Sequence, residues 1–232
     1  MQLMMIVGVL VLNLMGCAST AVRNAGDDCD LTEYRAAVEE IMRSDQQYRD
    51  ILAWGTTDPD ELERLKSLPD DEQMAEMMKR KKDRVALGPE LTEELWDKQV
   101  AIDRVNTHEL MRWVRACGWP SEELLGEGTP SMVPVLIHMQ MDDAAWVLPV
   151  LREEVLAGRM EPGPYAMIYD RKQQHEGLPQ LYGMTQAFDR KTMQPLAPAI
   201  VNLEETNSAR AEIGMDPIEE YRITDAQTAA GR

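Results

Sequence analysis

The chain has little aromatic character and few cysteines. Aromatic residues make up 5% of its 232 residues, with a single phenylalanine, Phe188. The 17 methionines must therefore fill much of the hydrophobic core, a role that suits their flexible side chains. The chain has three cysteines and no Cys-x-x-Cys spacing, which excludes a thioredoxin-like redox motif.

Positive charge is also scarce. The chain has 24 Lys and Arg against 41 Asp and Glu, which gives a formal net charge of −17 at pH 7. Nucleic-acid binding needs a basic face, so this balance argues against a nucleic-acid partner. It argues equally against adsorption to an anionic lipid surface. The acidity by itself indicates no more than a well-hydrated exterior.

Familiar catalytic and cofactor-binding motifs are absent from the sequence. There is no glycine-rich phosphate loop, no Gly-x-Ser-x-Gly and no His-Glu-x-x-His. The three histidines, His108, His138 and His175, are far apart and lack paired carboxylates at ligand spacing. We therefore predict no metal and no cofactor, and expect a structural role for each histidine. If the chain is an enzyme, which its sequence leaves open, the weak candidates for acid–base catalysis are His138, His108 and Asp170.

Only the N-terminus carries a long hydrophobic run, residues 3–15. At roughly 13 residues it is too short for a comfortable membrane span and typical of a signal-peptide core. It ends in Leu14-Met15-Gly16-Cys17, which resembles the lipobox of bacterial lipoproteins. The resemblance implies that Cys17 becomes the first mature residue and carries acyl chains such as palmitate.

Two features depart from the lipobox pattern. No Lys or Arg precedes the hydrophobic run, and Met15 occupies a position where a small residue is usual. An ordinary signal peptide or an N-terminal membrane helix is the alternative. No Asp follows Cys17 directly, so the pattern favours an anchor in the outer membrane, with the protein facing the periplasm.

The other two cysteines are Cys29 and Cys117. In an oxidising periplasm they could form a disulfide and close a loop of 117 − 29 = 88 residues. The sequence does not show whether their backbones approach each other. A disulfide and two separate thiols both stay open.

Hydrophobic residues recur at helical spacing over most of the chain, which predicts a mainly α fold, an irregular multi-helix bundle. Helices are expected over residues 30–54, 59–68, 70–87, 92–117, 121–125, 129–141, 142–156, 164–177, 202–214 and 216–221. A small β-hairpin or extended segment is expected near residues 180–197. We predict a signal peptide at 1–16, a tether at 17–29, a single helical domain at 30–222 and a disordered tail at 223–232.

Polar residues with helical spacing form the candidate ligand site. Asp45 and Arg49 are four residues apart, which is also the spacing of an ordinary helix ion pair. Adjacent residues on a helix point in different directions, so Asp170 and Arg171 each need a partner of their own. They either fix their helix to the segment that follows or help to form a polar pocket. The residues predicted to bind a ligand are Asp45, Arg49, Asn106, Asp170, Arg171, Gln180, Tyr182 and Gln186.

Several short motifs together resemble a bacterial family known only as a domain of unknown function. The motifs are Asp45-Gln46 with Arg49, Asp103 with Asn106, Gly118-Trp119-Pro120, Asp170-Arg171, Gly177 with Gln180, Tyr182-Gly183-Met184-Thr185-Gln186, Asn207 with Arg210, and Gly214 to Tyr221. The resemblance implies a mainly helical domain with a shared polar site, and it implies no activity.

This chain departs from the family pattern in two places. The family's usual form here resembles Tyr-Gly-Thr-Gln, and this chain has an additional residue or a local change at Met184. A Gln-His-Ala triplet is usual in the hydrophobic helix that follows Gly-Trp-Pro, and Gln140 stands where the family has its histidine, with His138 two positions earlier. This departure weakens the case for catalysis.

Two functions follow from these patterns. The first is a lipid-anchored bacterial envelope protein whose helical domain binds a small molecule, an envelope polymer or a protein partner, and which meets the membrane through its anchor alone. The alternative is a hydrolase-type enzyme in which His138 or His108 is the base, Asp170 orients it and Arg171 holds an anion. A histidine bonded to a carboxylate at the floor of a cleft would favour the enzyme.

Overall fold

The computed structural model describes residues 29–83, 85–185, 187–188, 195–196 and 199–218. The predicted signal peptide, the predicted lipidation site Cys17, most of the predicted tether and the predicted C-terminal tail lie outside these residues. The described part is mainly α-helical, as the sequence predicts. Its helices are α1 Leu31–Gln46, α2 Arg49–Trp54, α3 Pro59–Lys66, α4 Asp70–Lys82, α5 Pro89–Cys117, α6 Glu122–Leu125, α7 Val133–His138, the 3₁₀ helix η1 Met141–Asp143, α8 Ala144–Leu156, α9 Pro162–His175 and α10 Leu203–Glu212.

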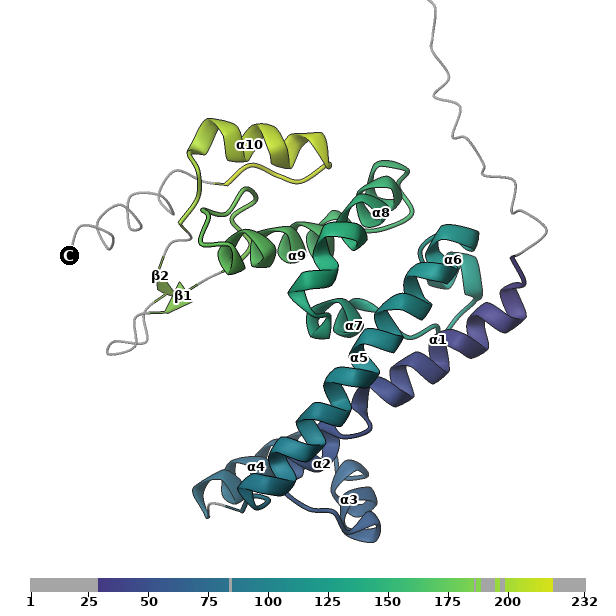
Figure 1. The fold of residues 1–232 in the computed structure, drawn as a ribbon, viewed down its shortest axis with the longest axis vertical. Helices are drawn as coiled ribbons and strands as arrows, with labels where there is room; N and C mark the ends of the chain where they lie inside the picture. The colour runs from purple at the N-terminus through teal and green to yellow at the C-terminus, as the bar shows by residue number, and fades with distance from the viewer. Residues whose placement is uncertain (1–28, 84, 186, 189–194, 197–198, 219–232) are drawn as a thin grey trace, which may run out of the picture.

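Helices α1 and α5 form the axis of the fold. Figure 1 shows them side by side, with α2, α3 and α4 at one end of the pair and α6 at the other. On α1 the buried side chains follow one face, from Tyr34 through Val38 and Ile41 to Asp45. The carboxylate of Asp30 accepts hydrogen bonds from the backbone N–H groups of residues 32 and 33, so Asp30 is the N-cap of α1.

The chain breaks where the sequence predicts one continuous helix over residues 30–54. Helix α1 ends at Gln46 and α2 begins at Arg49. The backbone N–H of Tyr48 donates to the side-chain oxygen of Gln99 on α5 at 3.0 Å. The Tyr48 N–H at the break is thus satisfied by a side chain from another helix. No local sequence pattern indicates a hydrogen bond between residues so far apart in the chain.

Helices α7, α8 and α9 pack beside the α1–α5 pair and complete the hydrophobic core (Figure 1). A polar contact fixes the turn after α5. The buried carboxylate of Glu154 on α8 accepts a hydrogen bond from the backbone N–H of Trp119 at 2.9 Å. It also accepts from the Nε and Nη2 atoms of Arg159. The hydroxyl of Tyr34 donates to the carbonyl of Gly118 in the same turn.

The predicted hairpin is described only in small part. Two short strands, β1 Ala187–Phe188 and β2 Pro195–Leu196, pair antiparallel, and an isolated parallel bridge joins Gln180 to Ile200. The residues that would connect the strands lie outside the described part, so the hairpin stays a prediction.

A disulfide links Cys29 to Cys117, with the two Cα atoms 5.4 Å apart. It ties Cys29, two residues before the start of α1, to the last residue of α5. Of the two states that the sequence left open, the structure therefore shows the disulfide and not two separate thiols.

Within the described ranges, no helix has both the length and the apolar character needed to cross a membrane.

Candidate functional site

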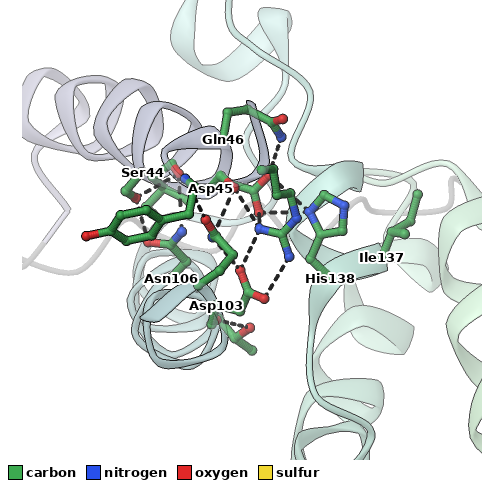
Figure 2. Close-up of polar contacts among 12 residues, drawn as sticks. Ser44, Asp45, Gln46, Asp103, Asn106, Ile137 and His138 are labelled. Carbon is green, nitrogen blue, oxygen red and sulfur yellow. Dashed lines mark hydrogen bonds and ion pairs between the residues drawn. The ribbon is translucent and has the colours of Figure 1, made fainter. Parts of the chain in front are cut away.

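The centre of the candidate site is the buried carboxylate of Asp45, near the end of α1. Its side chain is 1% exposed. The Nδ1 atom of His138, the last residue of α7, lies 2.9 and 3.0 Å from its two oxygens. Figure 2 shows the imidazole pointing at this carboxylate. The side chain of Gln46 also donates to Asp45, so the carboxylate has partners on two sides.

An ion pair adjoins this contact. The guanidinium of Arg49 donates to both carboxylate oxygens of Asp103, at 2.8 and 2.7 Å, and to the backbone carbonyl of Asp45 at 2.6 Å. The Arg49 and Asp103 side chains are 14% and 3% exposed. Bidentate geometry is the strongest form of this interaction, and it fixes the plane of the guanidinium.

Gln99 connects the ion pair to the break between α1 and α2. It lies on α5, one turn before Asp103, and is fully buried. Its amide nitrogen donates to the Asp45 carbonyl and to the Asp103 carboxylate, and its oxygen accepts from the Tyr48 backbone. The Asp45 carbonyl and the Tyr48 N–H, two backbone groups at the helix break, therefore have partners inside the cluster.

A pocket of about 540 Å³ opens beside this cluster. Its volume lies in the range typical of small-molecule sites, roughly 300–1,000 Å³. Polar groups line one part of it and hydrophobic side chains most of the rest. The lining residues are Arg49, Leu52, Ala53, Ala86, Leu87, Thr92, Trp96 and His138.

The contact with Asp45 determines which nitrogen of His138 is available. A carboxylate only accepts hydrogen bonds, so Nδ1 carries the proton and donates. In the neutral ring, Nε2 then has a free lone pair, and no partner for it is found among the described residues. The His138 side chain is 26% exposed and lines the pocket. This arrangement can accept a proton from a bound molecule or donate one to it.

Asn106 also joins α1 to α5, but it does not line the pocket at His138. Its oxygen accepts from the Ser44 hydroxyl at 2.9 Å, and its nitrogen donates to the Ile41 carbonyl. Ser44 and Asn106 line a groove between α1 and α5 rather than the pocket at His138. Asn106 therefore connects α1 to α5.

Asp170 and the residues that follow α9 form a second, separate cluster. The Asp170 carboxylate is fully buried and accepts from the backbone N–H groups of Leu181, Tyr182 and Met184, at 2.8, 2.9 and 2.7 Å. Burial raises the pKa of this carboxyl, and the backbone donors oppose the rise. The side chain of Gln180 binds the backbone of Thr185 in both directions. These bonds fix the loop to α9, which is the structural alternative that the sequence allowed.

The remaining predicted site residues are distributed over the molecule. The carboxylate beside His138 is Asp45, not Asp170, which corrects the pairing expected for the hydrolase alternative. Arg171 donates to the backbone carbonyl of Ile137, next to His138. Burial lowers the pKa of the Arg171 guanidinium. His108 is exposed on α5 and stacks on Trp146.

Tyr182 packs edge-on against Tyr165 and Tyr169 and lines a polar pocket with α10. Gln140 precedes η1, and its backbone carbonyl accepts from Asp143. Gln186 and Cys17 lie outside the described residues. No group of three or more His, Cys, Asp or Glu within the described part is arranged to hold a metal ion.

The sequence did not identify Gln99 as part of the site, nor Asp45 as the partner of His138. Gln99 lies four residues before Asp103, so helical spacing could have suggested it. Asp45 and His138 are 93 residues apart and carry no such signal.

Comparisons with known proteins give one match. A model described as a family of unknown function (DUF6624) matches residues 73–230, more than half of the chain. The match includes Asp103 and His138, whereas Asp45 and Arg49 precede it. No curated protein matches the chain. No solved structure matches it either.

Proposed function

This chain belongs to the DUF6624 family of unknown function, and on that premise we propose that its helical domain binds a small molecule in the pocket beside His138. One observation carries the proposal. The buried Asp45 holds the ring of His138 by Nδ1, at the wall of a pocket that Arg49 also lines. Convergent polar groups in a largely hydrophobic pocket are the usual mark of a ligand site.

We also propose that the protein is anchored by Cys17 in the bacterial envelope, on the periplasmic side. The hydrophobic run before Cys17 supports this, and so does the pairing of Cys29 with Cys117, because disulfides persist in oxidising compartments. Palmitate labelling in a bacterial host tests the anchor. Wild-type protein should incorporate the label and Cys17→Ser should not. Equal labelling of the two proteins would contradict the anchor.

Thermal unfolding in the presence of small molecules tests the pocket. The purified protein is screened against envelope metabolites and peptidoglycan fragments, and a ligand of the folded state raises the unfolding midpoint. His138→Phe should abolish the rise. The matched control is His108→Phe, which changes an exposed histidine outside the pocket and should leave the rise intact. A rise that survives His138→Phe would place the ligand elsewhere.

A hydrolase-type activity is the second candidate. It is favoured by the contact of His138 with the Asp45 carboxylate at the pocket, which is the geometry expected of an enzyme, and by the unpartnered Nε2 of His138. In such a reaction Nε2 takes a proton from water, and the oxygen attacks a carbonyl carbon. Arg49 then stabilises the charge that develops on the carbonyl oxygen. The tetrahedral intermediate re-forms the carbonyl as its bond to the alcohol breaks, and the leaving alcohol takes the proton back from Nε2. Hydrolysis of p-nitrophenyl esters of different chain lengths tests this reaction. Asp45→Asn should lower kcat, whereas an activity unchanged by both Asp45→Asn and His138→Phe would exclude the dyad.

A further inference from the structure

Exposed hydrophobic side chains gather at one end of the molecule. Eleven large hydrophobic side chains are exposed among the described residues, and six of them fall between residues 74 and 96. The six are Met74, Met77, Met78, Val85, Leu91 and Trp96. Helix α4, which carries the three methionines, buries none of its residues. We call these six side chains the apolar corner.

The apolar corner adjoins the pocket beside His138. Ala86, Leu87 and Trp96 line the pocket, and Val85 directly precedes Ala86. Trp96 belongs to both features, because it lines the pocket and is still 45% exposed. The hydrophobic wall of the pocket thus leads to hydrophobic surface outside it. Exposed apolar surface of this kind commonly marks a binding site.

The other end of the pocket offers hydrogen bonds. Arg49 has five N–H donors, and three bonds from them are found, to Asp45 and Asp103. Its remaining donors have no partner among the described residues. Together with Nε2 of His138, they can bind a small polar head.

We propose that the pocket takes a single-chain amphiphile, such as a fatty acid. Its carboxylate head accepts from the remaining N–H donors of Arg49, beside the ring of His138, and its acyl chain lies along the hydrophobic wall at Leu87 and Trp96. The inference rests on the ligand pocket proposed above and specifies its occupant. A purely polar metabolite would leave the walls at Leu52, Leu87 and Trp96 without apolar contacts. An envelope anchor would hold the protein beside a supply of such molecules.

Dodecanoate, below its micelle concentration, is the probe, and tryptophan fluorescence is the readout. Trp54, Trp113 and Trp119 are buried, and Trp146 is half-buried and does not line the pocket. Trp96 is 45% exposed and lines the pocket. Binding should therefore shift the emission of Trp96 to shorter wavelength in a saturable manner. Butanoate, which has the same head and a short chain, should bind at least tenfold more weakly. Trp96→Phe should remove the spectral change, and calorimetry should still detect heat of binding.

Two variants test whether the acyl chain of dodecanoate lies in the pocket. Leu87→Glu puts a charge on the apolar wall at a half-buried position and should weaken dodecanoate binding at least tenfold. Val105→Glu is the matched control, because Val105 is 67% exposed on α5 and lines the other groove. It should leave the affinity unchanged. Equal weakening by the two variants, or none from Leu87→Glu, would overturn the inference.

The same measurements separate this inference from the proposal on which it rests. If polar metabolites raise the unfolding midpoint through His138 and dodecanoate does not bind, the pocket stands and the amphiphile is wrong. If dodecanoate binds as strongly to His138→Phe and Arg49→Gln as to wild type, the head position is wrong. If no compound binds at the pocket, both proposals fail.

Discussion

The Nδ1 atom of His138 lies within 3.0 Å of both carboxylate oxygens of Asp45, although 93 residues separate them in the chain. The contact joins the end of α7 to the end of α1, beside the pocket. It gives the histidine one orientation and one free nitrogen. The site therefore depends on how α1 and α7 are placed by the rest of the fold.

Removing the carboxylate of Asp45 should release the ring of His138. In wild type, nitrogen NMR of the imidazole should show the proton of the neutral ring on Nδ1. In Asp45→Ala the two tautomers should mix, and the free energy of unfolding should fall by about 1–3 kcal/mol, since buried polar groups lose their partner. Glu40→Ala, at an exposed position of the same helix, should change stability by less than about 0.5 kcal/mol. A wild-type signal from the Nε2–H form would contradict the contact.

The Arg49–Asp103 pair should contribute far more than an exposed pair on α1. Asp103→Ala leaves a largely buried guanidinium without its carboxylate and should cost about 3–5 kcal/mol in urea unfolding. The control is Arg43→Ala, which removes the exposed pair with Glu40 and should cost about 0–1 kcal/mol. A double-mutant cycle with Arg49→Met isolates the coupling. Similar losses from the buried and exposed pairs would refute this difference.

The disulfide between Cys29 and Cys117 should stabilise the fold by restricting the unfolded chain. A Cys29→Ser, Cys117→Ser double variant should lose about 2–4 kcal/mol of unfolding free energy, because the bond closes an 88-residue loop. Reductant should lower the unfolding midpoint of wild type and leave that of the double variant unchanged. Reaction of Cys29 and Cys117 in folded, unreduced wild type with a thiol reagent would show that the bond is absent.

Asp170 should determine the order of the loop after α9. Asp170→Ala removes the acceptor of three backbone N–H groups, each of which costs about 1–3 kcal/mol when left unsatisfied in the interior. Hydrogen exchange at Leu181, Tyr182 and Met184 should accelerate. Asp170→Asn keeps one acceptor oxygen and should have a smaller effect. Glu176→Ala, at the exposed end of α9, serves as the control. Unchanged exchange in Asp170→Ala would exclude this role.

Buried tyrosines should make the fold sensitive to alkaline pH. Burial raises the pKa of Tyr34 and of Tyr182 above the ordinary value of 10.0. A raised pKa means that the folded state holds its proton more tightly than the unfolded state does. The contribution of these tyrosines to the free energy of unfolding should therefore be constant below about pH 10 and fall above it. Tyr34→Phe should reduce the slope of that fall, and an identical slope would contradict the assignment.

Local features of the fold could be predicted from the sequence. The helices predicted to begin at residues 30 and 202 do begin there, with Asp30 and Asn202 as N-caps. The sequence indicates such starts because capping hydrogen bonds join residues close together in the chain. The mainly α character follows from hydrophobic spacing in the same way. The split between α1 and α2 could not be predicted, since its partner, Gln99, lies on another helix.

The sequence by itself determined the helices, the acidic surface and the set of polar residues worth testing. The tertiary structure alone decided that Asp45 meets His138, that Arg49 meets Asp103, and that Asp170 serves its own loop instead of the pocket. Helical periodicity reports which face of a helix is buried but not which other face it contacts. That choice depends on the packing of the whole core, and the pocket exists only once α2, α5 and α7 have met.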